Sequence, residues 1–152
     1  MARFAYNWTV NRESENHKSG KNFISDGELR KEFTKLKKTD EYSWINDVSN
    51  DVTKQAIKDA CNAYKRFFNG ISELPKKKRK KKSRPSFYQD SVKIKFTETH
   101  VRIEGLSNSQ KRNKQQLNWV RLAEKNRVPI GVKYFNPRVT YDGVNWWISV
   151  GV

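Results

Sequence analysis

The chain has 152 residues, 35% of them apolar and 32% charged, and its formal net charge is +16 at pH 7. This length suits one domain or two small lobes, and five Trp, eight Phe and six Tyr residues argue against wholesale disorder. A single cysteine excludes an internal disulfide, two histidines leave too few ligands for a Cys/His zinc site, and no apolar stretch approaches the ~20 residues of a membrane span.

Helical periodicity dominates the first half of the chain. A first helix ends near Gly20, and its apolar stripe comprises Phe4, Trp8 and Val10. Ser25 or Asp26 then has the character of an N-cap. The helix that follows repeats its apolar residues at helical spacing: Leu29, Phe33 and Leu36. Residues 43–45 predict a turn or a short 3₁₀ segment.

The longest predicted helix spans residues 50–69, with Ser49 as its N-cap and Gly70 just past its end. Its apolar stripe comprises Val52, Ala56, Ile57, Ala60, Cys61, Tyr64, Phe67 and Phe68. The opposite face carries Lys54, Lys58, Asn62 and Lys65. Such a face serves either solubility alone or contact along a nucleic-acid groove.

The next segment is the most unusual of the chain, because basic residues fill nearly all of it between Pro75 and Pro85. They are Lys76, Lys77, Lys78, Arg79, Lys80, Lys81, Lys82 and Arg84. Up to Leu74 the chain has 13 basic and 11 acidic residues, whereas from Pro75 onward it has 19 and 5. Like charges this dense repel one another unless a polyanion neutralises them. We therefore expect RNA or DNA phosphates on this segment, with a solvated linker as the plain alternative.

After this run the hydrophobic period changes from that of a helix to that of a strand. The predicted strands are residues 92–96, 101–104, 119–122, 138–141 and 145–152. The first two form a hairpin with its turn near residues 98–99, and the last two form a hairpin about Asp142 and Gly143. Residues 105–116 are polar and basic, which predicts a loop or a ragged helix.

These patterns predict an α+β fold with three regions. Residues 1–74 form a helical lobe, residues 75–90 a basic linker, and residues 91–152 a small antiparallel β lobe. No group of acidic residues in the β half has the spacing that converges on a metal pair.

Five segments occur in a recognisable order. They are Arg3-Phe-Ala-Tyr-Asn-Trp8, Ala63-Tyr-Lys-Arg-Phe-Phe68, Leu74-Pro75 with the lysine run after it, Asn118-Trp-Val-Arg-Leu122, and Val139-Thr-Tyr-Asp-Gly-Val-Asn-Trp-Trp-Ile-Ser-Val150. In order and spacing they resemble the N-terminal region of the OrfB/TnpB proteins of small bacterial insertion sequences, relatives of the type V CRISPR effectors. The resemblance covers essentially all 152 residues.

This resemblance implies a helical recognition lobe inserted in a β-barrel wedge lobe, a region long labelled the helix-turn-helix DNA-binding domain of a transposase. Together the lobes hold a guide RNA and inspect a short motif beside the DNA target. The family's leading strand and first helix, with a Tyr-Pro pair, have no counterpart here. The chain also stops before the Asp-x-Gly that opens the family's nuclease domain. The resemblance therefore implies an incomplete barrel without catalytic residues, metal or cofactor.

We expect a non-enzymatic fragment that binds guide-type RNA, double-stranded target DNA, or both, in the context of transposition and DNA recombination. The alternatives are half of a split RNA-guided endonuclease whose catalytic part is a separate chain, a decayed transposase remnant, and a general basic RNA-binding protein. We expect no membrane partner. The expected location is the prokaryotic cytoplasm, in association with the nucleoid.

The candidate binding residues extend beyond the basic segment. The resemblance transfers recognition of the target-adjacent motif to Lys54 and Lys58 on the long helix. The neighbouring candidates are Asn62 and Lys65 on the same face, and Arg30 and Lys31 on the preceding helix. Phe87 and Tyr88, directly after the basic segment, either stack on unpaired bases or enter the β core.

Overall fold

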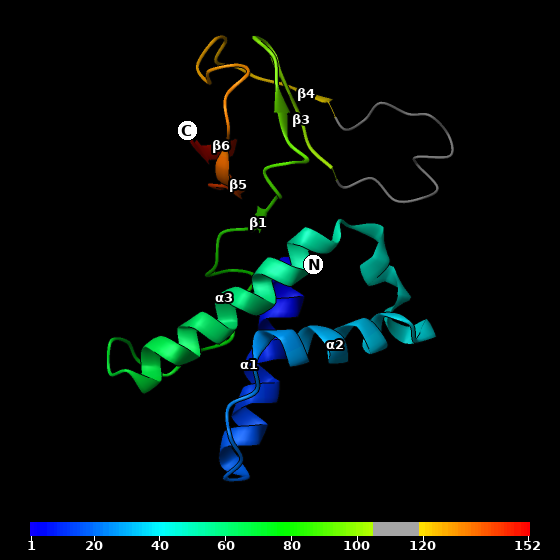
Figure 1. Ribbon diagram of the computed structural model, residues 1–152, viewed down its shortest axis with the longest axis vertical. Coiled ribbons are helices and arrows are strands. Elements are labelled where there is room, and N and C mark those ends of the chain that lie inside the picture. The colour runs from blue at the N-terminus through cyan, green and yellow to red at the C-terminus, as the bar shows by residue number, and fades with distance from the viewer. Residues whose placement is uncertain (105–118) are drawn as a thin grey trace.

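The structure, a computed structural model, describes residues 1–104 and 119–152. Within these residues four helices precede six strands, so the α+β class with an N-terminal helical part and C-terminal antiparallel strands is confirmed (Figure 1). We call residues 1–70 the helical part and residues 86–104 with 119–152 the β part. The loop or ragged helix expected over residues 105–116 lies outside the described residues.

In the helical part, the two later α-helices begin where the sequence places a capping residue. The elements are α1 (Ala2–Lys18), α2 (Asp26–Lys37), the 3₁₀ helix η1 (Asp40–Asp47) and α3 (Asn50–Phe68). At α2, the Ser25 hydroxyl accepts a hydrogen bond from the Glu28 backbone N–H at 3.3 Å, and the Glu28 carboxylate accepts one from the Ser25 N–H in return. At α3, the Ser49 hydroxyl accepts from the Asp51 N–H at 3.3 Å. The predicted caps of both helices are therefore confirmed.

The core of the helical part lies between α1, α2 and α3. Its buried apolar residues are Ala5, Leu29, Phe33, Ile45, Ala56, Ile57 and Cys61, with Val10, Ala60 and Tyr64 in an adjoining cluster. The apolar stripe predicted for α3 is confirmed from Val52 to Tyr64 and fails at Phe68, which is 49% exposed. Phe68 lies in the last turn of α3, so its ring has neighbours on one side only and packs against Phe23 and Tyr64.

The stripe predicted for α1 is only partly right. Phe4 and Trp8 are half-buried, and the fully buried residues of α1 are Ala5, Thr9, Val10 and Glu13. Small side chains on this face let the α1 backbone approach α3 closely, which moves the large rings to the edge of the contact. There Trp8 packs edge-on against Phe33, with ring centroids 5.1 Å apart.

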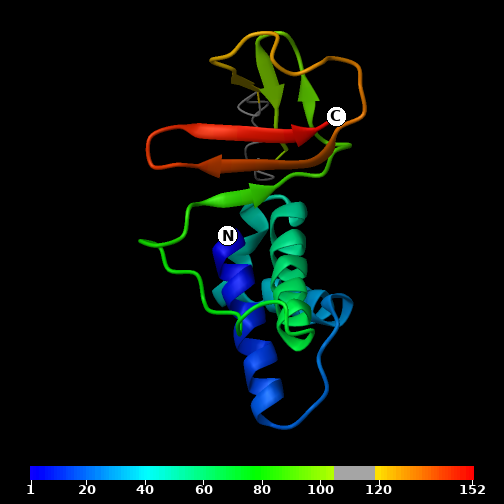
Figure 2. The same ribbon diagram turned by 90° about the vertical axis from the view of Figure 1, so that its left-hand side faces the viewer.

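The β part consists of two small antiparallel sheets. One has the order β1-β5-β6 and contains β1 (Ser86–Tyr88), β5 (Phe135–Tyr141) and β6 (Trp146–Gly151). The other has the order β2-β3-β4 and contains β2 (Lys95–Phe96), β3 (His100–Arg102) and β4 (Trp119–Arg121). Their shared core contains Ile94, Phe96, Val101 and Tyr134. The described strands form no closed barrel, and Figure 2 shows β1, β5 and β6 stacked above the helical part with β1 nearest to it.

The last hairpin is confirmed with its turn at the predicted place. The Asp142 carboxylate accepts hydrogen bonds from the Val144 and Asn145 N–H groups at 2.8 and 2.7 Å, and from the Trp147 indole N–H at 2.6 Å. These donors stabilise the ionised carboxylate and lower the pKa of Asp142 to about 2. Gly143 has φ +108°, a conformation that favours glycine.

Two strand predictions need correction. The alternating residues 92–96 do not form one strand, because β2 contains only Lys95 and Phe96, and Val92 is 79% exposed. The chain turns at Asp90, whose carboxylate accepts from the Val92 N–H at 3.2 Å and whose carbonyl accepts from the Lys93 N–H at 3.0 Å. In addition, residues 86–88, which fall in the expected linker, form β1 and pair with β5. The sequence offered two roles for Phe87 and Tyr88, stacking on bases or entry into the β core. Their backbone lies in β1 of the β part, and their side chains are half-buried.

Candidate nucleic-acid interface

The basic run, residues 76–84, crosses from the end of α3 to the start of β1. All of its lysines and arginines are exposed, and Ser83 is half-buried. A turn gathers part of the run, because the Arg79 carbonyl accepts from the Lys82 and Ser83 N–H groups at 3.1 and 2.9 Å. Eight cations are thus presented to solvent over a short stretch of chain, which is the electrostatic footprint of a phosphate-binding segment.

One residue of the run is attached to the helical part. The Lys78 N–H donates to the Asn7 side-chain oxygen at 2.7 Å, and the Asn7 amide donates to the Lys78 carbonyl at 2.9 Å. The Lys78 ammonium lies over the Tyr6 ring, 4.2 Å from its centroid. Desolvation at this position lowers the pKa of Lys78, and the nearby Asp59 carboxylate opposes that shift. Lys78 therefore anchors the run against α1.

The helical and β parts are joined by a bidentate ion pair. Arg138 of β5 donates to the Asp59 carboxylate of α3 from both guanidinium nitrogens, at 3.2 and 3.3 Å. Gln55, one turn earlier on α3, donates to the same carboxylate at 2.9 Å. Because both charged side chains are about one-third exposed, the pair orients β5 on α3 more than it stabilises the fold.

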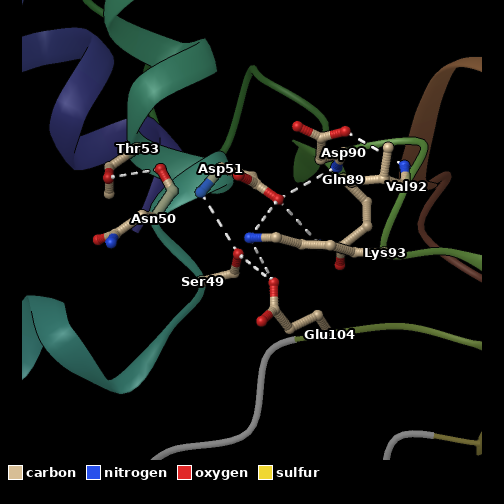
Figure 3. A network of polar contacts seen from close by, with 9 residues as sticks. All are labelled: Ser49, Asn50, Asp51, Thr53, Gln89, Asp90, Val92, Lys93 and Glu104. Atoms are coloured by element: carbon tan, nitrogen blue, oxygen red, sulfur yellow. Dashed lines mark hydrogen bonds and ion pairs between the residues drawn. The ribbon is translucent and has the colours of Figure 1, made fainter.

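A second polar network joins the start of α3 to the β part (Figure 3). The Lys93 ammonium lies 2.7 Å from Glu104 and 3.2 Å from Asp51. The Asp51 carboxylate also accepts from the Asp90 N–H at 3.2 Å and from the Gln89 amide at 3.4 Å. The hydrogen bond to Glu104, and then that to Asp51, raise the pKa of Lys93. This network explains why residues 90–93 turn instead of continuing a strand.

Between these two junctions lies a groove of about 1030 Å³. The helical part contributes the beginning of α1, Trp44 of η1 and one side of α3, and the β part contributes β1 with Ile103, Val120 and Arg138. Its aromatic lining residues are Phe4, Trp44, Phe87 and Tyr88. Its charged lining residues are Arg3, Asp59, Lys78, Arg84, Glu104 and Arg138.

The structure separates the predicted site residues into groups. Lys78 and Arg84 of the basic run line the groove, together with Phe87 and Tyr88. The candidates on α3 are exposed on its outer face and do not line the groove: Lys54, Lys58, Asn62 and Lys65. On α2, Lys31 is exposed, whereas Arg30 is half-buried and forms an ion pair of 3.7 Å with Asp26. Arg30 is therefore less available to a ligand than Lys31.

Sequence reasoning missed three groove residues, namely Arg3, Trp44 and Arg138. Arg3 and Arg138 lie far apart in the chain and belong to different elements, α1 and β5, so no spacing rule connects them. For the segment around Trp44 the sequence predicts only a turn or a short 3₁₀ segment, and Trp44 is 41% exposed because η1 places it at the edge of the helical core. Its exposure follows from the path of the chain between α2 and α3.

Within residues 1–104 and 119–152, no group of three or more His, Cys, Asp or Glu side chains is placed to hold a metal ion. None of the described helices is long and apolar enough to span a membrane. Cys61 is buried on α3, and burial raises the pKa of its thiol to about 12, so it behaves as a small apolar residue.

No protein-family model matches the chain. The chain is similar to "Putative RNA-guided DNA endonuclease InsQ" of Escherichia coli (strain K12), with 27% identity over 148 residues. The match takes in 97% of this chain and 34% of InsQ, so the chain spans about one third of the length of that curated relative. This similarity supports the resemblance to OrfB/TnpB proteins that the five ordered segments indicate.

Proposed function

We propose that this chain is a nucleic-acid-binding portion of a TnpB-like transposon protein, which holds guide-type RNA and engages double-stranded target DNA without cleaving it. The basic run contacts phosphates, and Lys54 and Lys58 of α3 contact the target DNA. Asn62 and Lys65 extend the same face of α3, and Lys31 with Arg30 adds a weaker contact from α2. Its site of action is the cytoplasm, in association with the nucleoid.

The observation that carries the proposal is the exposed basic run anchored beside a groove with aromatic and cationic lining. A run that served only as a solvated linker would have no need of the two hydrogen bonds that hold Lys78 to Asn7. The similarity to InsQ, which is named as a putative RNA-guided DNA endonuclease, supports RNA and DNA as the partners. The formal charge of +16 favours a polyanionic partner in either case.

A charge-matched pair of variants tests this proposal. The first replaces five exposed lysines of the run with glutamine and retains Lys78, which packs on Tyr6: Lys76, Lys77, Lys80, Lys81 and Lys82. The second replaces five exposed lysines elsewhere: Lys18, Lys21, Lys35, Lys38 and Lys125. Both lose the same net charge.

Affinity for a structured RNA and for duplex DNA is measured between 50 and 200 mM salt. The first variant is expected to bind more weakly and to lose about 0.7–0.9 in salt slope for each phosphate contact removed. The second variant is expected to retain most of the wild-type slope. Equal losses in the two variants would mean that net charge alone attracts the nucleic acid, and the assignment to the run would fail.

The nature of the RNA is tested by purifying the protein from its host and sequencing the bound nucleic acid. One dominant structured RNA is the expected result. A heterogeneous mixture released by moderate salt would contradict the guide-binding function and favour a decayed remnant or a general basic RNA-binding protein.

A second candidate is half of a split RNA-guided endonuclease whose catalytic part is a separate chain. The similarity to InsQ, which is named as a putative RNA-guided DNA endonuclease, favours this candidate. Co-purification of a second polypeptide that confers DNA cleavage on the complex would support it over the non-cleaving function.

A further inference from the structure

The charged residues of the groove leave a net positive lining. Its two carboxylates are already engaged. Asp59 pairs with Arg138 at 3.2 Å. Glu104 pairs with Lys93 at 2.7 Å, as Figure 3 shows. The remaining charged groups are Arg3, Lys78 and Arg84, and none of them forms an ion pair within the described part of the chain. The groove therefore offers three cations that form no ion pair with a carboxylate of the described residues, although the Asp59 carboxylate lies near Lys78.

The same groove presents aromatic rings beside those cations. Trp44 is 41% exposed, and its ring is held edge-on against Phe4 with centroids 5.2 Å apart. Tyr88 of β1 also lines the groove, and the Arg138 guanidinium lies 6.0 Å from the centroid of its ring. An exposed tryptophan whose orientation is fixed by packing loses little freedom when a planar ligand stacks on it.

Cations that follow a phosphate backbone and aromatic faces that receive bases are the two components of single-strand binding sites. A duplex does not use such rings, because its bases are already stacked on one another. The groove volume of about 1030 Å³ lies just above the ~300–1,000 Å³ typical of pockets that enclose small ligands. The groove is therefore large enough to hold a nucleotide with its flanking phosphates.

We propose that this groove binds an unpaired nucleotide of a single-stranded segment, with its base on Trp44 and its phosphates on Arg3, Lys78 and Arg84. This inference rests on the proposed nucleic-acid-binding function and names the chemical class that one part of the surface takes. It differs from phosphate binding by the exposed run, because it requires a base. Strands with and without bases therefore distinguish binding in the groove from phosphate binding by the run.

The experiment compares two labelled strands of equal length and equal phosphate number, one of oligo-uridine and one made of abasic residues. Wild-type protein is compared with Trp44→Leu, which retains apolar bulk against Phe4, and with Trp44→Phe, which retains a ring. The matched control is Trp146→Leu, because Trp146 is 60% exposed and does not line the groove. An oligo-deoxythymidine strand distinguishes ribose from deoxyribose as the preferred sugar.

Trp44→Leu is expected to weaken binding of oligo-uridine at least about 5-fold, the lower end of the loss measured when one stacking ring is removed. Its binding of the abasic strand and its salt slope are expected to stay unchanged. Trp44→Phe is expected to retain part of the affinity, and Trp146→Leu all of it. Affinity retained by Trp44→Phe would also show that the affinity lost in Trp44→Leu reflects the missing ring and not a less stable fold.

Equal weakening of the oligo-uridine and abasic strands by Trp44→Leu would overturn this inference, as would no weakening of either. Both results leave the proposed phosphate contacts of the run in place. Absence of wild-type binding to every single strand would overturn this inference alone, whereas absence of binding to structured RNA and duplex DNA as well would overturn the proposed function too.

Discussion

Asn7 and Lys78 are 71 residues apart in the chain and exchange two hydrogen bonds, from the Lys78 N–H to the Asn7 side-chain oxygen at 2.7 Å and from the Asn7 amide to the Lys78 carbonyl at 2.9 Å. The Asn7 side chain thus binds both the N–H and the carbonyl of Lys78, as a neighbouring strand would do. The run is thereby held beside the groove instead of moving freely between α3 and β1. A flexible polycation loses conformational entropy when it becomes ordered on RNA. Here much of that entropy is lost when the protein folds, so binding costs less.

The first prediction concerns this attachment. Asn7→Ala removes both hydrogen bonds, which are exposed, and is expected to lower the free energy of unfolding by about 1 kcal/mol. It is also expected to weaken RNA binding several-fold, because the released run orders only on binding. Urea denaturation and RNA titration measure the two effects. The control is Asn11→Ala, an exposed position on the same helix, and equal behaviour of the two variants would show that the attachment does not contribute.

The second prediction concerns the outer face of α3. Lys54→Ala and Lys58→Ala together are expected to change the DNA sequence preference more than the RNA affinity, because base contacts carry sequence information and phosphate contacts do not. Each lost base contact is expected to reduce discrimination by about 1–3 kcal/mol at one position. Selection from a randomised duplex library measures the preference, with Lys18→Ala and Lys21→Ala as the matched control. A uniform loss across all sequences would identify the two lysines as phosphate contacts.

The third prediction concerns the network at the start of α3. Lys93→Met leaves the Asp51 and Glu104 carboxylates without their shared cation and is expected to lower the free energy of unfolding by about 1–3 kcal/mol. Lys95→Met, on the exposed side of β2, is expected to change it little. Urea denaturation at pH 7 compares the two variants. Equal stability would mean that water replaces Lys93 without cost.

The fourth prediction concerns Glu13, a buried carboxylate of α1. Its Oε2 accepts from the Ile24 N–H at 3.3 Å, while Oε1 has no hydrogen-bond partner within the described residues. Desolvation raises the pKa of Glu13 above its ordinary value of 4.5, and the hydrogen bond from Ile24 only partly opposes this. The fold therefore disfavours the charged form of Glu13 relative to the unfolded chain.

The sign of the pH dependence follows from that raised pKa. Above it, the buried charge destabilises the fold fully, and the penalty fades as the pH falls through the raised pKa toward 4.5. Glu13→Gln is therefore expected to raise the free energy of unfolding at pH 7, with a gain that shrinks toward pH 4. Denaturation across this range measures the gain, and Glu15→Gln, at an exposed position, is the control. A gain that grew toward pH 4 would contradict the assigned shift.

Local features of the fold were predictable from the sequence because short-range physics determines them. Ser25 and Ser49 cap helices through residues two or three positions away, and Asp142 forms its turn with the next residues along the chain. The short strands were harder to predict. Alternation over residues 92–96 favours a strand, whereas the ion pairs of Lys93 with Asp51 and Glu104 favour a turn. A distant ion pair outweighs local strand propensity there.

Composition and periodicity are local properties of the chain, and they were enough to predict the charge asymmetry, the lysine face of α3 and the order of helices before strands. Three features of the candidate site emerge only in the folded protein: Lys78 is attached to Asn7, Arg138 pairs with Asp59 79 residues away, and Trp44 is exposed at the groove. Each depends on how distant segments pack, namely the basic run on α1, the β part on α3, and η1 at the edge of the helical core. That packing is set by the summed contacts of both parts, and no single segment of the chain encodes it.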